Sequence, residues 1–249
     1  MMIISLDKNR SGRDFVVGDL HGSFEAFSNL LKHIDFDDRC DRVVAVGDII
    51  DRGKDSQACL ELLNSGWFYS VLGNHEDLML KWSLSSPELR PAVEHQWCEE
   101  GGRWFFSLPG KQQSRCIQLA EKLPLAIVIE SGCHLYVVLH AEIPPEIDDF
   151  QDFITGIVED DRQIIHSCLW GRRRKQGRYT SVVHGIDYIL AGHSPSHFPR
   201  IRHGNSLILD FGAAGQGFDS GLGLLELATQ RLYIQRQNQI DIHEAVTFL

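Results

Sequence analysis

The sequence lacks the features that mark secreted, membrane-spanning and disulfide-stabilised proteins. No run of about 18 apolar residues occurs, and the first ten residues lack a basic segment followed by a long apolar one. These absences predict a cytoplasmic protein without membrane association. No two of its six cysteines form a C-x-x-C pair, and several lie in apolar stretches. We therefore expect reduced core thiols rather than zinc ligands or disulfides at Cys40, Cys59, Cys98, Cys116, Cys133 and Cys168.

The chain also lacks an excess of positive charge. It carries 34 acidic and 24 basic side chains, and its formal net charge is −10. An acidic protein repels a polyanion at long range, so we expect no nucleic-acid partner. No repeat, low-complexity segment or linker interrupts the sequence, and its length suits one domain with a well-buried core. We predict a single domain over residues 1–249, with a monomer as the default state.

Strand and helix patterns alternate over the first third of the chain. Short β-branched or aliphatic runs are followed by segments whose apolar residues recur at helical spacing. Such a β-α-β-α-β-α succession predicts a parallel sheet. The predicted strands are 14–17, 42–46 and 67–72, and the predicted helices are 23–33, 55–64 and one that opens at His75.

The rest of the chain divides into a helical part and a β part. Residues 83–122 contain prolines and paired glycines between apolar helical pieces, which predicts a helical insert or cap. Beyond them the pattern is one of short strands bounded by turns, beginning with a hairpin that turns at Ser131 and Gly132. We predict an α/β fold in which two mixed sheets pack face to face with helices outside, an α/β/β/α sandwich. The later strands are 125–129, 135–139, 188–191, 206–209, 223–227 and 232–235.

Three short motifs directly follow the three early strands. They read Gly-Asp-Leu-His-Gly at 18–22, Gly-Asp-Ile-Ile-Asp-Arg-Gly at 47–53 and Gly-Asn-His-Glu at 73–76. Open α/β folds gather their ligands at the carboxyl ends of parallel strands. Carboxylate, imidazole and amide groups without thiolates suit a hard or borderline divalent metal. The sequence therefore predicts a metal site at this edge of the sheet.

Each of these features also has an ordinary structural explanation when taken alone. The first motif could be a loop start, the second a surface ion pair on a turn, and the third a helix cap. Their spacing of about 25–30 residues, as β-α-β units require, makes a threefold coincidence implausible. His140 and His193 each end an apolar segment, and from the residues alone they could be metal ligands or histidines at the edge of the core.

The three motifs resemble the signature blocks of the PPP family of metallophosphatases. Within that family the chain is most similar to the compact serine/threonine protein phosphatases of bacteria and bacteriophage lambda. The resemblance runs from about residue 14 to residue 227, nearly the whole chain. Further matching segments are 100–106, 121–125, 138–142, 169–172 and 191–195.

This resemblance implies a site with two divalent metal ions. Manganese is the metal that the family suggests, and the oxygen and nitrogen ligands also admit iron or zinc. One carboxylate, that of Asp48, would bridge the two ions. The first ion would be held by Asp19, His21 and Asp48, and the second by Asp48, Asn74, His140 and His193.

The resemblance also implies a reaction. Arg52 and Arg172 would bind the phosphoryl oxygens, and His75, oriented by Asp51, would protonate the leaving group. A water shared by the two metals would attack phosphorus directly, without a covalent phosphoenzyme. The expected activity is hydrolysis of serine and threonine phosphomonoesters in a phosphorylated protein or peptide substrate, with tyrosine or histidine phosphate as further candidates.

Three other functions stay open at this point. A dinucleoside polyphosphate hydrolase, acting for example on diadenosine tetraphosphate, would use the same fold and metals, and Trp97, Trp104, Phe105 and Phe106 could line its base slot. A nuclease or phosphodiesterase is disfavoured by the net charge and by Gly-His-Ser-Pro at 192–195, where such enzymes typically carry Gly-His-x-His. A binding module on a degenerate scaffold would have lost ligands, and all of them are present.

Residues outside the motifs are assigned weaker roles. The basic residues after Arg172 could attract an acidic or phosphorylated substrate, although such runs usually face solvent. Asp210 follows a late strand and is expected to support the metal site structurally. Three further histidines are expected to have no catalytic role. The basic residues are Arg173, Arg174, Lys175 and Arg178, and the histidines are His95, His197 and His203.

Overall fold

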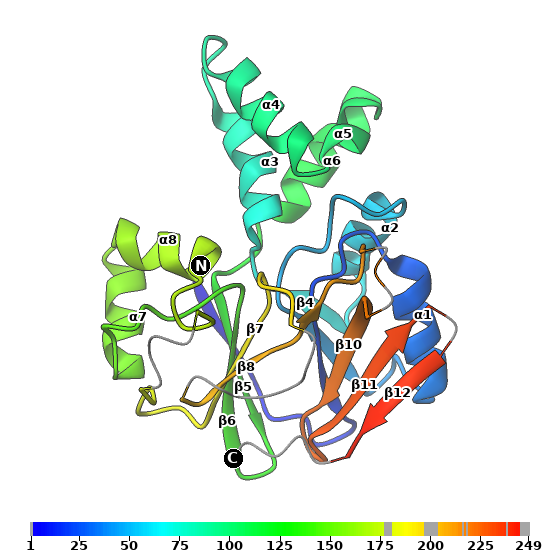
Figure 1. Ribbon diagram of the computed structural model, residues 1–249, viewed down its shortest axis with the longest axis vertical. Helices are drawn as coiled ribbons and strands as arrows, with labels where there is room; N and C mark the ends of the chain where they lie inside the picture. Colours follow the sequence, from blue (N-terminus) through cyan, green and yellow to red (C-terminus); the bar gives the residue numbers. More distant parts are fainter. Residues whose placement is uncertain are drawn as a thin grey trace.

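Two β-sheets packed face to face form the body of the molecule, and helices cover their outer faces (Figure 1). This arrangement confirms the predicted α/β/β/α sandwich. The computed structural model describes residues 2–176, 181–196, 204–215, 217, 219–237 and 239–244.

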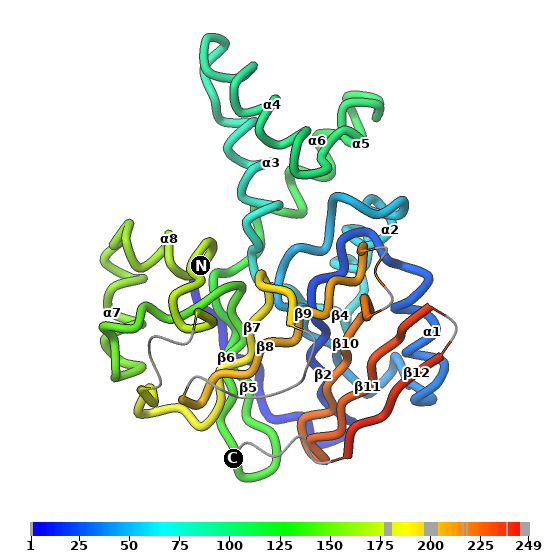
Figure 2. The backbone as a smooth tube through the Cα atoms, in the orientation of Figure 1, coloured from blue at the N-terminus to red at the C-terminus, as the bar shows by residue number. Residues whose placement is uncertain are grey.

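One sheet carries the three motifs. Its strands β2 (Asp14–Val17), β3 (Arg42–Ala45) and β4 (Phe68–Ser70) run parallel, so their carboxyl ends meet at one edge. Antiparallel strands extend the sheet beyond β2, in the order β12-β11-β10-β2-β3-β4 with β9 beside β10. In Figure 2 the blue β2 lies next to the orange β10, although the two are far apart in the sequence. The added strands are β9 (Asp210–Phe211), β10 (Gly221–Glu226), β11 (Arg231–Arg236) and β12 (Gln239–His243).

The other sheet has the strand order β1-β5-β6-β7-β8. Its central strands β6 (His134–Leu139) and β7 (Tyr188–Ala191) are parallel, so the residues that follow them also emerge at one edge. This topology places His140 and His193 side by side at the ends of neighbouring strands. The remaining strands are β1 (Ile3–Leu6), β5 (Ala126–Ser131) and β8 (Ser206–Ile208).

Alternating side chains of the strands fill the interior. In β2, Val16 packs between the sheets, whereas Phe15 and Val17 join the cluster beneath the helices, as the pleat of a strand requires. From the other sheet, Ile127 and Leu190 pack in the same cluster as Val16. The two inner faces therefore form one aliphatic core, which fixes the relative position of the strand ends that bear the motifs.

Apolar helix faces cover the outer side of each sheet. Phe27 of α1 is buried in one cluster with Phe15, and Phe153 of α7 is buried in another with Val137. The helices on the motif side are α1 (Phe24–His33), α2 (Ser56–Glu61) with a 3₁₀ turn η1 (Leu62–Asn64), and α3 (Asn74–Leu84); those on the other side are α7 (Phe150–Val158) and α8 (Arg162–Trp170).

A helical insert projects beyond the sandwich (Figure 1). Helix α3 begins in the third motif and leads directly into it, so the insert is attached at the strand ends rather than at a remote loop. Trp97 and Phe105 have no exposed surface and belong to the same apolar cluster as Phe27 of α1. The helices fall within the predicted segment 83–122, and the single-domain organisation stays a prediction. They are α4 (Arg90–Glu99), α5 (Arg103–Phe106) and α6 (Gly110–Ala120).

Most predicted elements are confirmed with shifts of one or two residues at their ends. The β5–β6 turn is centred on Gly132 and Cys133, one residue later than predicted, because Gly132 adopts the left-handed conformation with a φ of 62°. The expectation of buried thiols is wrong for Cys133, because its place in this turn leaves it exposed. The sequence pattern does not predict β1, β9, β12, α7 or α8. The buried cysteines are Cys59, Cys116 and Cys168, and the partly buried ones are Cys40 and Cys98.

The core between the sheets gives a first testable prediction. Leu225 in β10 is fully buried there. We expect Leu225→Ala to lower the free energy of unfolding by about 2–5 kcal/mol, because it removes apolar contacts and leaves a cavity. The matched control is Leu84→Ala, whose side chain is 82% exposed and whose loss should cost less than about 0.5 kcal/mol. Urea denaturation measures both, and equal effects would contradict this view of the core.

Candidate metal centre

The six predicted metal ligands all lie at the carboxyl ends of parallel strands. Three strands of the motif sheet and two of the other sheet deliver them to the same place, where the two sheets meet. All six side chains are nearly inaccessible to solvent. Asp19 and His21 follow β2, Asp48 follows β3, Asn74 opens α3 after β4, His140 follows β6, and His193 follows β7.

The carboxylate of Asp48 lies at the centre of this group. Its Oδ2 is 3.4 Å from Nε2 of His140, 3.7 Å from Nε2 of His21 and 3.8 Å from Nε2 of His75. Two triads offer ligand atoms within 4.8 Å of one another, and Asp48 belongs to both. A carboxylate shared by two clusters is the arrangement that a pair of bridged cations requires. The triads are His21, Asp48 and His75, and Asp48, His140 and His193. The first contains His75 in place of Asp19, the ligand that the resemblance implies, so this geometric grouping does not by itself separate ligands from neighbouring groups.

The backbone fixes the orientation of two of these imidazoles. Nδ1 of His21 lies 3.0 Å from the carbonyl oxygen of Ile50, and Nδ1 of His140 lies 2.8 Å from that of Val46. A carbonyl accepts only, so Nδ1 carries the proton in both rings. The Nε2 lone pairs then face the centre. Metal-binding histidines are held by such a hydrogen bond from their second nitrogen.

Acceptor atoms crowd together beside Asp48. Oδ1 of Asn74 lies 2.8 Å from Nε2 of His140 and 2.9 Å from Nδ1 of His193. An amide oxygen cannot donate, so these contacts are favourable only when a proton or a metal ion lies between the lone pairs. The donor set of carboxylate, imidazole and amide fits a divalent cation.

Asp19 reaches the centre through the backbone of His193. Its two carboxylate oxygens accept the N–H of His193 at 3.2 and 3.0 Å, so the first and the last motif are joined directly. Burial, together with the nearby carboxylate of Asp210, raises the pKa of Asp19 well above its ordinary value. Gly192 makes this approach possible, because a Cβ there would overlap the carboxylate of Asp19. Asp210 therefore acts on Asp19 through its charge, and its role in structural support of the metal site stays a prediction.

The electrostatic balance of the site favours cation binding. Burial lowers the pKa of His21 and of His193 to about 3, so both rings are neutral near pH 7 and keep a lone pair. At His140 burial acts in the same direction, but the charge of Asp48 outweighs it and raises the pKa to about 9. The buried negative charge thus draws a cation, either a proton or a metal ion, to the His140 side of the centre.

Five residues of the site adopt left-handed backbone conformations. Such conformations are uncommon for residues other than glycine and cost about 1–3 kcal/mol each, so the surrounding structure must hold them. Such conformations cluster at functional sites. The φ values are 43° at His21, 48° at Asp48, 72° at Asp51, 64° at Arg52 and 67° at His193.

Glu76, which sequence analysis passed over, holds two of the motif loops together. Its buried carboxylate accepts the backbone N–H of Gly73 and Asp48 through Oε2, and those of Ile49 and Ile50 through Oε1, at 2.9–3.2 Å. These four bonds satisfy donors that would otherwise be buried without partners. Its place as the last residue of Gly-Asn-His-Glu, in the first turn of α3, is the signal that could have revealed it.

The two arginines lie on opposite sides of the site. Nη1 of Arg52 donates to Nε2 of His21 at 2.9 Å, and its Nη2 lies 3.1 Å from Nε2 of His75. Nε of Arg172 donates to Nε2 of His193 at 3.1 Å. Both guanidinium groups therefore face the imidazoles around the centre, where they can bind the oxygens of a phosphoryl group.

His75 and Asp51 form a buried pair. Nδ1 of His75 lies 2.7 Å from Oδ2 of Asp51. Burial alone would lower the pKa of His75, but the charge of Asp48 and the hydrogen bond with Asp51 outweigh it and raise the pKa. From the sequence, Trp97 and Trp104 are expected only as walls of a base slot; in the structure both indoles donate to Asp51, at 2.7 Å each.

The basic residues after Arg172 divide into several roles. Arg174 is buried, and its guanidinium donates to the carbonyl oxygens of Ile143 and Ser181 at 2.7 and 2.9 Å, so the expectation that it attracts substrate is wrong. Arg173 pairs with Glu146, and Lys175 donates to the carbonyl of Pro195. Of the remaining expected residues, His95 is exposed next to Glu99, whereas Arg178, His197 and His203 lie outside the described residues.

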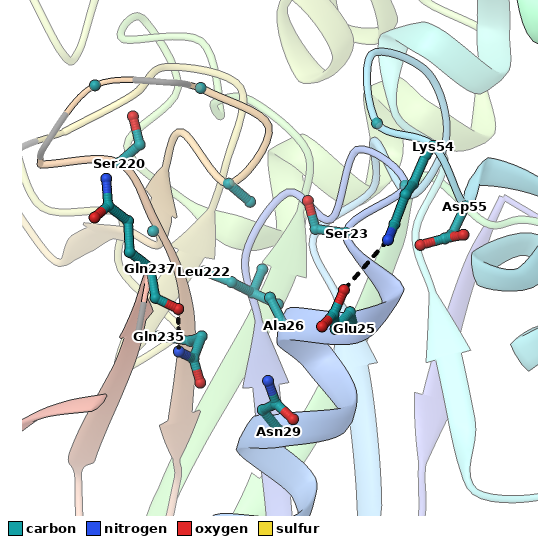
Figure 3. Close-up of a pocket in the computed structure, with 16 residues that line it drawn as sticks. Ser23, Glu25, Ala26, Asn29, Lys54, Asp55, Ser220, Leu222, Gln235 and Gln237 are labelled. Atoms are coloured by element: carbon teal, nitrogen blue, oxygen red, sulfur yellow. Dashed lines mark hydrogen bonds and ion pairs between the residues drawn. The ribbon is translucent and has the colours of Figure 1, made fainter. Parts of the chain in front are cut away.

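A polar cavity of about 430 Å³ opens beside the motifs, between α1 and the loop before β10 (Figure 3). Gly22 and Gly53, which directly follow His21 and Arg52, belong to its wall. Its charged side chains are one lysine and two carboxylates, and Nζ of the lysine lies 3.3 Å from one of them. The cavity offers hydrogen-bonding groups without net positive charge. The charged residues are Lys54, Glu25 and Asp55.

Comparison with known proteins agrees with this geometry. Residues 15–197 match the family model described as calcineurin-like phosphoesterase. The chain is 32% identical over 206 residues to serine/threonine-protein phosphatase 1 of Salmonella typhimurium, covering 82% of this chain and 88% of that protein. It is 29% identical over 136 residues to the symmetrical bis(5'-nucleosyl)-tetraphosphatase of Haemophilus ducreyi, covering 54% of this chain and 46% of that protein.

A solved structure also shares the fold. It is a protein provisionally described as a diadenosine tetraphosphatase, with a TM-score of 0.61 and 22% identity, covering 95% of this chain and 99% of that one. At this identity the likeness supports the fold alone. Within the part of the chain that the structure describes, we find no helix with the length and apolar character needed to cross a bilayer.

The metal centre predicts a specific stabilisation by divalent cations. We expect Mn²⁺, added after chelator treatment, to raise the melting temperature, because an ion bound only by the folded state adds about 2.7 kcal/mol at one hundred times its dissociation constant. Asp48→Asn should lose most of this shift, since Asp48 belongs to both triads. The control is Asp148→Asn at an exposed carboxylate, which should keep it. An equal shift in both variants, measured by differential scanning fluorimetry, would place the ions elsewhere.

Proposed function

The chain belongs to the calcineurin-like phosphoesterase family, and on that premise we propose that it is a metal-dependent protein phosphatase acting on serine and threonine phosphomonoesters. Its similarity to the Salmonella phosphatase spans most of both chains, whereas its similarity to the Haemophilus tetraphosphatase spans about half of each. The proposed active site consists of the six buried metal ligands, the two arginines and the pair formed by His75 and Asp51.

The packing of the insert is the observation that carries the choice of substrate. Trp97 and Phe105, candidates for a base slot, have no exposed surface and pack against each other with ring centroids 4.9 Å apart. Trp104 lines a cavity whose charged side chains are Lys54, Asp55 and Glu61, and Glu61 pairs with Arg115. This wall carries no excess of positive charge that would attract a nucleoside polyphosphate, and the buried rings of Trp97 and Phe105 are not accessible to a base.

We assign the metal ligands as the resemblance implied. When bound, divalent ions supply Lewis-acid chemistry: they lower the pKa of water and neutralise phosphoryl oxygens. Manganese is our choice of activating metal, and iron and zinc fit the same ligands. One ion would be held by Asp19, His21 and Asp48, and the other by Asp48, Asn74, His140 and His193.

The chain's own side chains perform the remaining steps. Arg52 and Arg172 bind the non-bridging phosphoryl oxygens from two sides and stabilise the charge that develops on them. Asp51 accepts a hydrogen bond from Nδ1–H of His75. The other ring nitrogen, Nε2, is then the atom that donates a proton to the departing serine or threonine oxygen. The raised pKa of His75 keeps that proton available near neutral pH. Removing the ring should therefore slow bond cleavage and leave metal binding intact.

A second candidate is a dinucleoside tetraphosphatase, which would use the same metal centre. Its support is the similarity to the Haemophilus enzyme over half of the chain. The two activities differ in the bond that breaks, a phosphomonoester in one and a phosphoanhydride in the other. Direct comparison of substrates therefore separates them.

Turnover of a phosphothreonine peptide and of diadenosine tetraphosphate tests the proposal. At matched concentrations with Mn²⁺ we expect a higher kcat/KM for the peptide, and no turnover of either substrate in the presence of chelator. Faster cleavage of the dinucleotide would keep the fold and the metal centre but reject the protein-phosphatase assignment. Phosphate release is the measurement for the peptide, and chromatography of the nucleotides serves for the dinucleotide.

The role of His75 gives a further prediction. His75→Asn should lower kcat for the phosphothreonine peptide by about 10²–10⁴-fold, the usual contribution of a general acid, with metal content unchanged. His95→Asn, at an exposed histidine next to Glu99 in the insert, is the control and should retain full activity. Steady-state kinetics measures kcat of both variants, and elemental analysis measures their metal content. An unchanged kcat in His75→Asn would refute the assignment.

A further inference from the structure

Two indole groups of the helical insert bind the same buried carboxylate. Nε1 of Trp97 donates to Oδ2 of Asp51, and Nε1 of Trp104 donates to Oδ1, both at 2.7 Å. Oδ2 also accepts Nδ1 of His75 at 2.7 Å. Asp51 has no exposed surface. Within the described residues, the side-chain hydrogen bonds of this carboxylate are therefore made by His75 and by two residues of the insert.

We propose that Trp97 and Trp104 are positioning residues that fix Asp51 and, through it, the proton-donating orientation of His75. This inference rests on the proposed function, because it concerns the residue that protonates the leaving group. It gives the insert a defined part in the reaction. The insert orients the general acid His75 through Asp51, while the residues at the strand ends would bind the metals.

The chemistry of the indole makes this arrangement directional. An indole N–H donates and cannot accept, so each oxygen of Asp51 must act as an acceptor. Both oxygens of Asp51 therefore act as acceptors, and the hydrogen bond between Oδ2 and His75 is donated by Nδ1–H. The ring is fixed with Nδ1 toward Asp51 and Nε2 toward the phosphoryl site. Two donors on different oxygens also prevent the carboxylate from rotating about its Cβ–Cγ bond.

The backbone between the two tryptophans fits them closely to the second motif. Gly101, with a φ of 108°, lies against the backbone of Arg52, where a Cβ would come within 2.6 Å of its nitrogen. A Cβ on Gly102 would overlap the ring of Trp97. Glu100 adds an ion pair with Arg52 at 3.3 Å. The segment that joins α4 to α5 is thus packed directly on the loop that carries Asp51.

A buried indole needs an acceptor wherever it lies, so its hydrogen bond alone does not establish a role in the reaction. The neighbouring Trp82 provides the comparison. Its ring packs against Trp97 and Phe105 in the same aromatic cluster, but its Nε1 donates to Glu94 within the insert at 3.3 Å. An indole in this cluster can therefore find a hydrogen-bond acceptor within the insert. The indoles of Trp97 and Trp104, which lie on separate helices, instead both donate to the carboxylate that orients His75.

The first experiment compares two substrates whose leaving groups differ in their need for a proton. This comparison separates a positioning role of the tryptophans from a purely structural one. A serine alkoxide needs a proton to depart, whereas p-nitrophenolate departs without one. We expect Trp97→Phe and Trp104→Phe to lower kcat for a phosphoserine peptide about tenfold or more, a part of the full effect of a general acid. Their kcat for p-nitrophenyl phosphate should change less than about threefold, and KM for both substrates should stay close to wild type.

Trp82→Phe is the matched control, because it alters the same aromatic cluster without touching Asp51. It should retain wild-type kcat on both substrates. Equal losses on the two substrates in the Trp97 and Trp104 variants, or a loss of the same size and substrate dependence in Trp82→Phe, would overturn the inference and reduce the tryptophans to packing residues.

A double-mutant cycle tests whether the effect passes through Asp51. In an Asp51→Asn background, Trp97→Phe and Trp104→Phe should lower kcat for the phosphoserine peptide no further, because the group that they position is already altered. If each tryptophan substitution kept its full effect in that background, the tryptophans would act by another route and the inference would fail.

A spectroscopic test is independent of activity. In ¹⁵N-labelled protein, Asp51→Asn should move the indole N–H resonances of Trp97 and Trp104, since it replaces a charged acceptor with a neutral one, and should leave that of Trp82 in place. Unchanged Trp97 and Trp104 resonances would refute the shared hydrogen bond. Should the wild-type protein hydrolyse neither phosphomonoester, the proposed function would fall, while this spectrum would still decide whether the insert binds Asp51.

Discussion

The buried carboxylate of Asp48 is the group on which the rest of the site depends. A negative charge without solvent contact is costly unless cations or donors surround it. Three imidazoles approach its Oδ2 within 3.8 Å, and they come from both sheets. The aliphatic core between the sheets fixes the distance between these strand ends, so packing and electrostatics are coupled. A metal-binding site of this kind is therefore a property of the whole sandwich rather than of one loop. The imidazoles belong to His21, His75 and His140.

The loops that carry the ligands are strained, and other groups hold them. Asp48 and His193 have left-handed backbones, with φ of 48° and 67°. Glu76 ties the loop of Asp48 to the start of α3 through four backbone N–H groups. Asp19 accepts the N–H of His193 and joins the two sheets. The insert packs on the later part of the same loop, where Trp97 and Trp104 donate to Asp51, the partner of His75.

Much of this could be predicted from the sequence, because the relevant signals are local. Strand ends followed by Asp, His and Asn bring the candidate ligands to one edge of the sheet, and the resemblance to a known family extended this prediction to His140 and His193. What could not be predicted depends on contacts between distant segments. The pairing of Trp104 with Asp51 spans 53 residues, and the burial of Arg174 depends on carbonyl groups that lie up to 31 residues before it. A run of basic residues looks solvent-facing until the loop that covers it is known. Cys133 is different, because its exposure follows from its place in the local turn between β5 and β6 rather than from distant contacts.

The central claim is that Asp48 lies between two cations. Electron paramagnetic resonance of the protein loaded with Mn²⁺, together with elemental analysis, tests it most directly. The account predicts two ions per chain and the spectrum of an exchange-coupled pair, because one carboxylate would connect them. One ion per chain, or two ions with uncoupled spectra, would contradict the account and leave Asp48 as the ligand of a single metal.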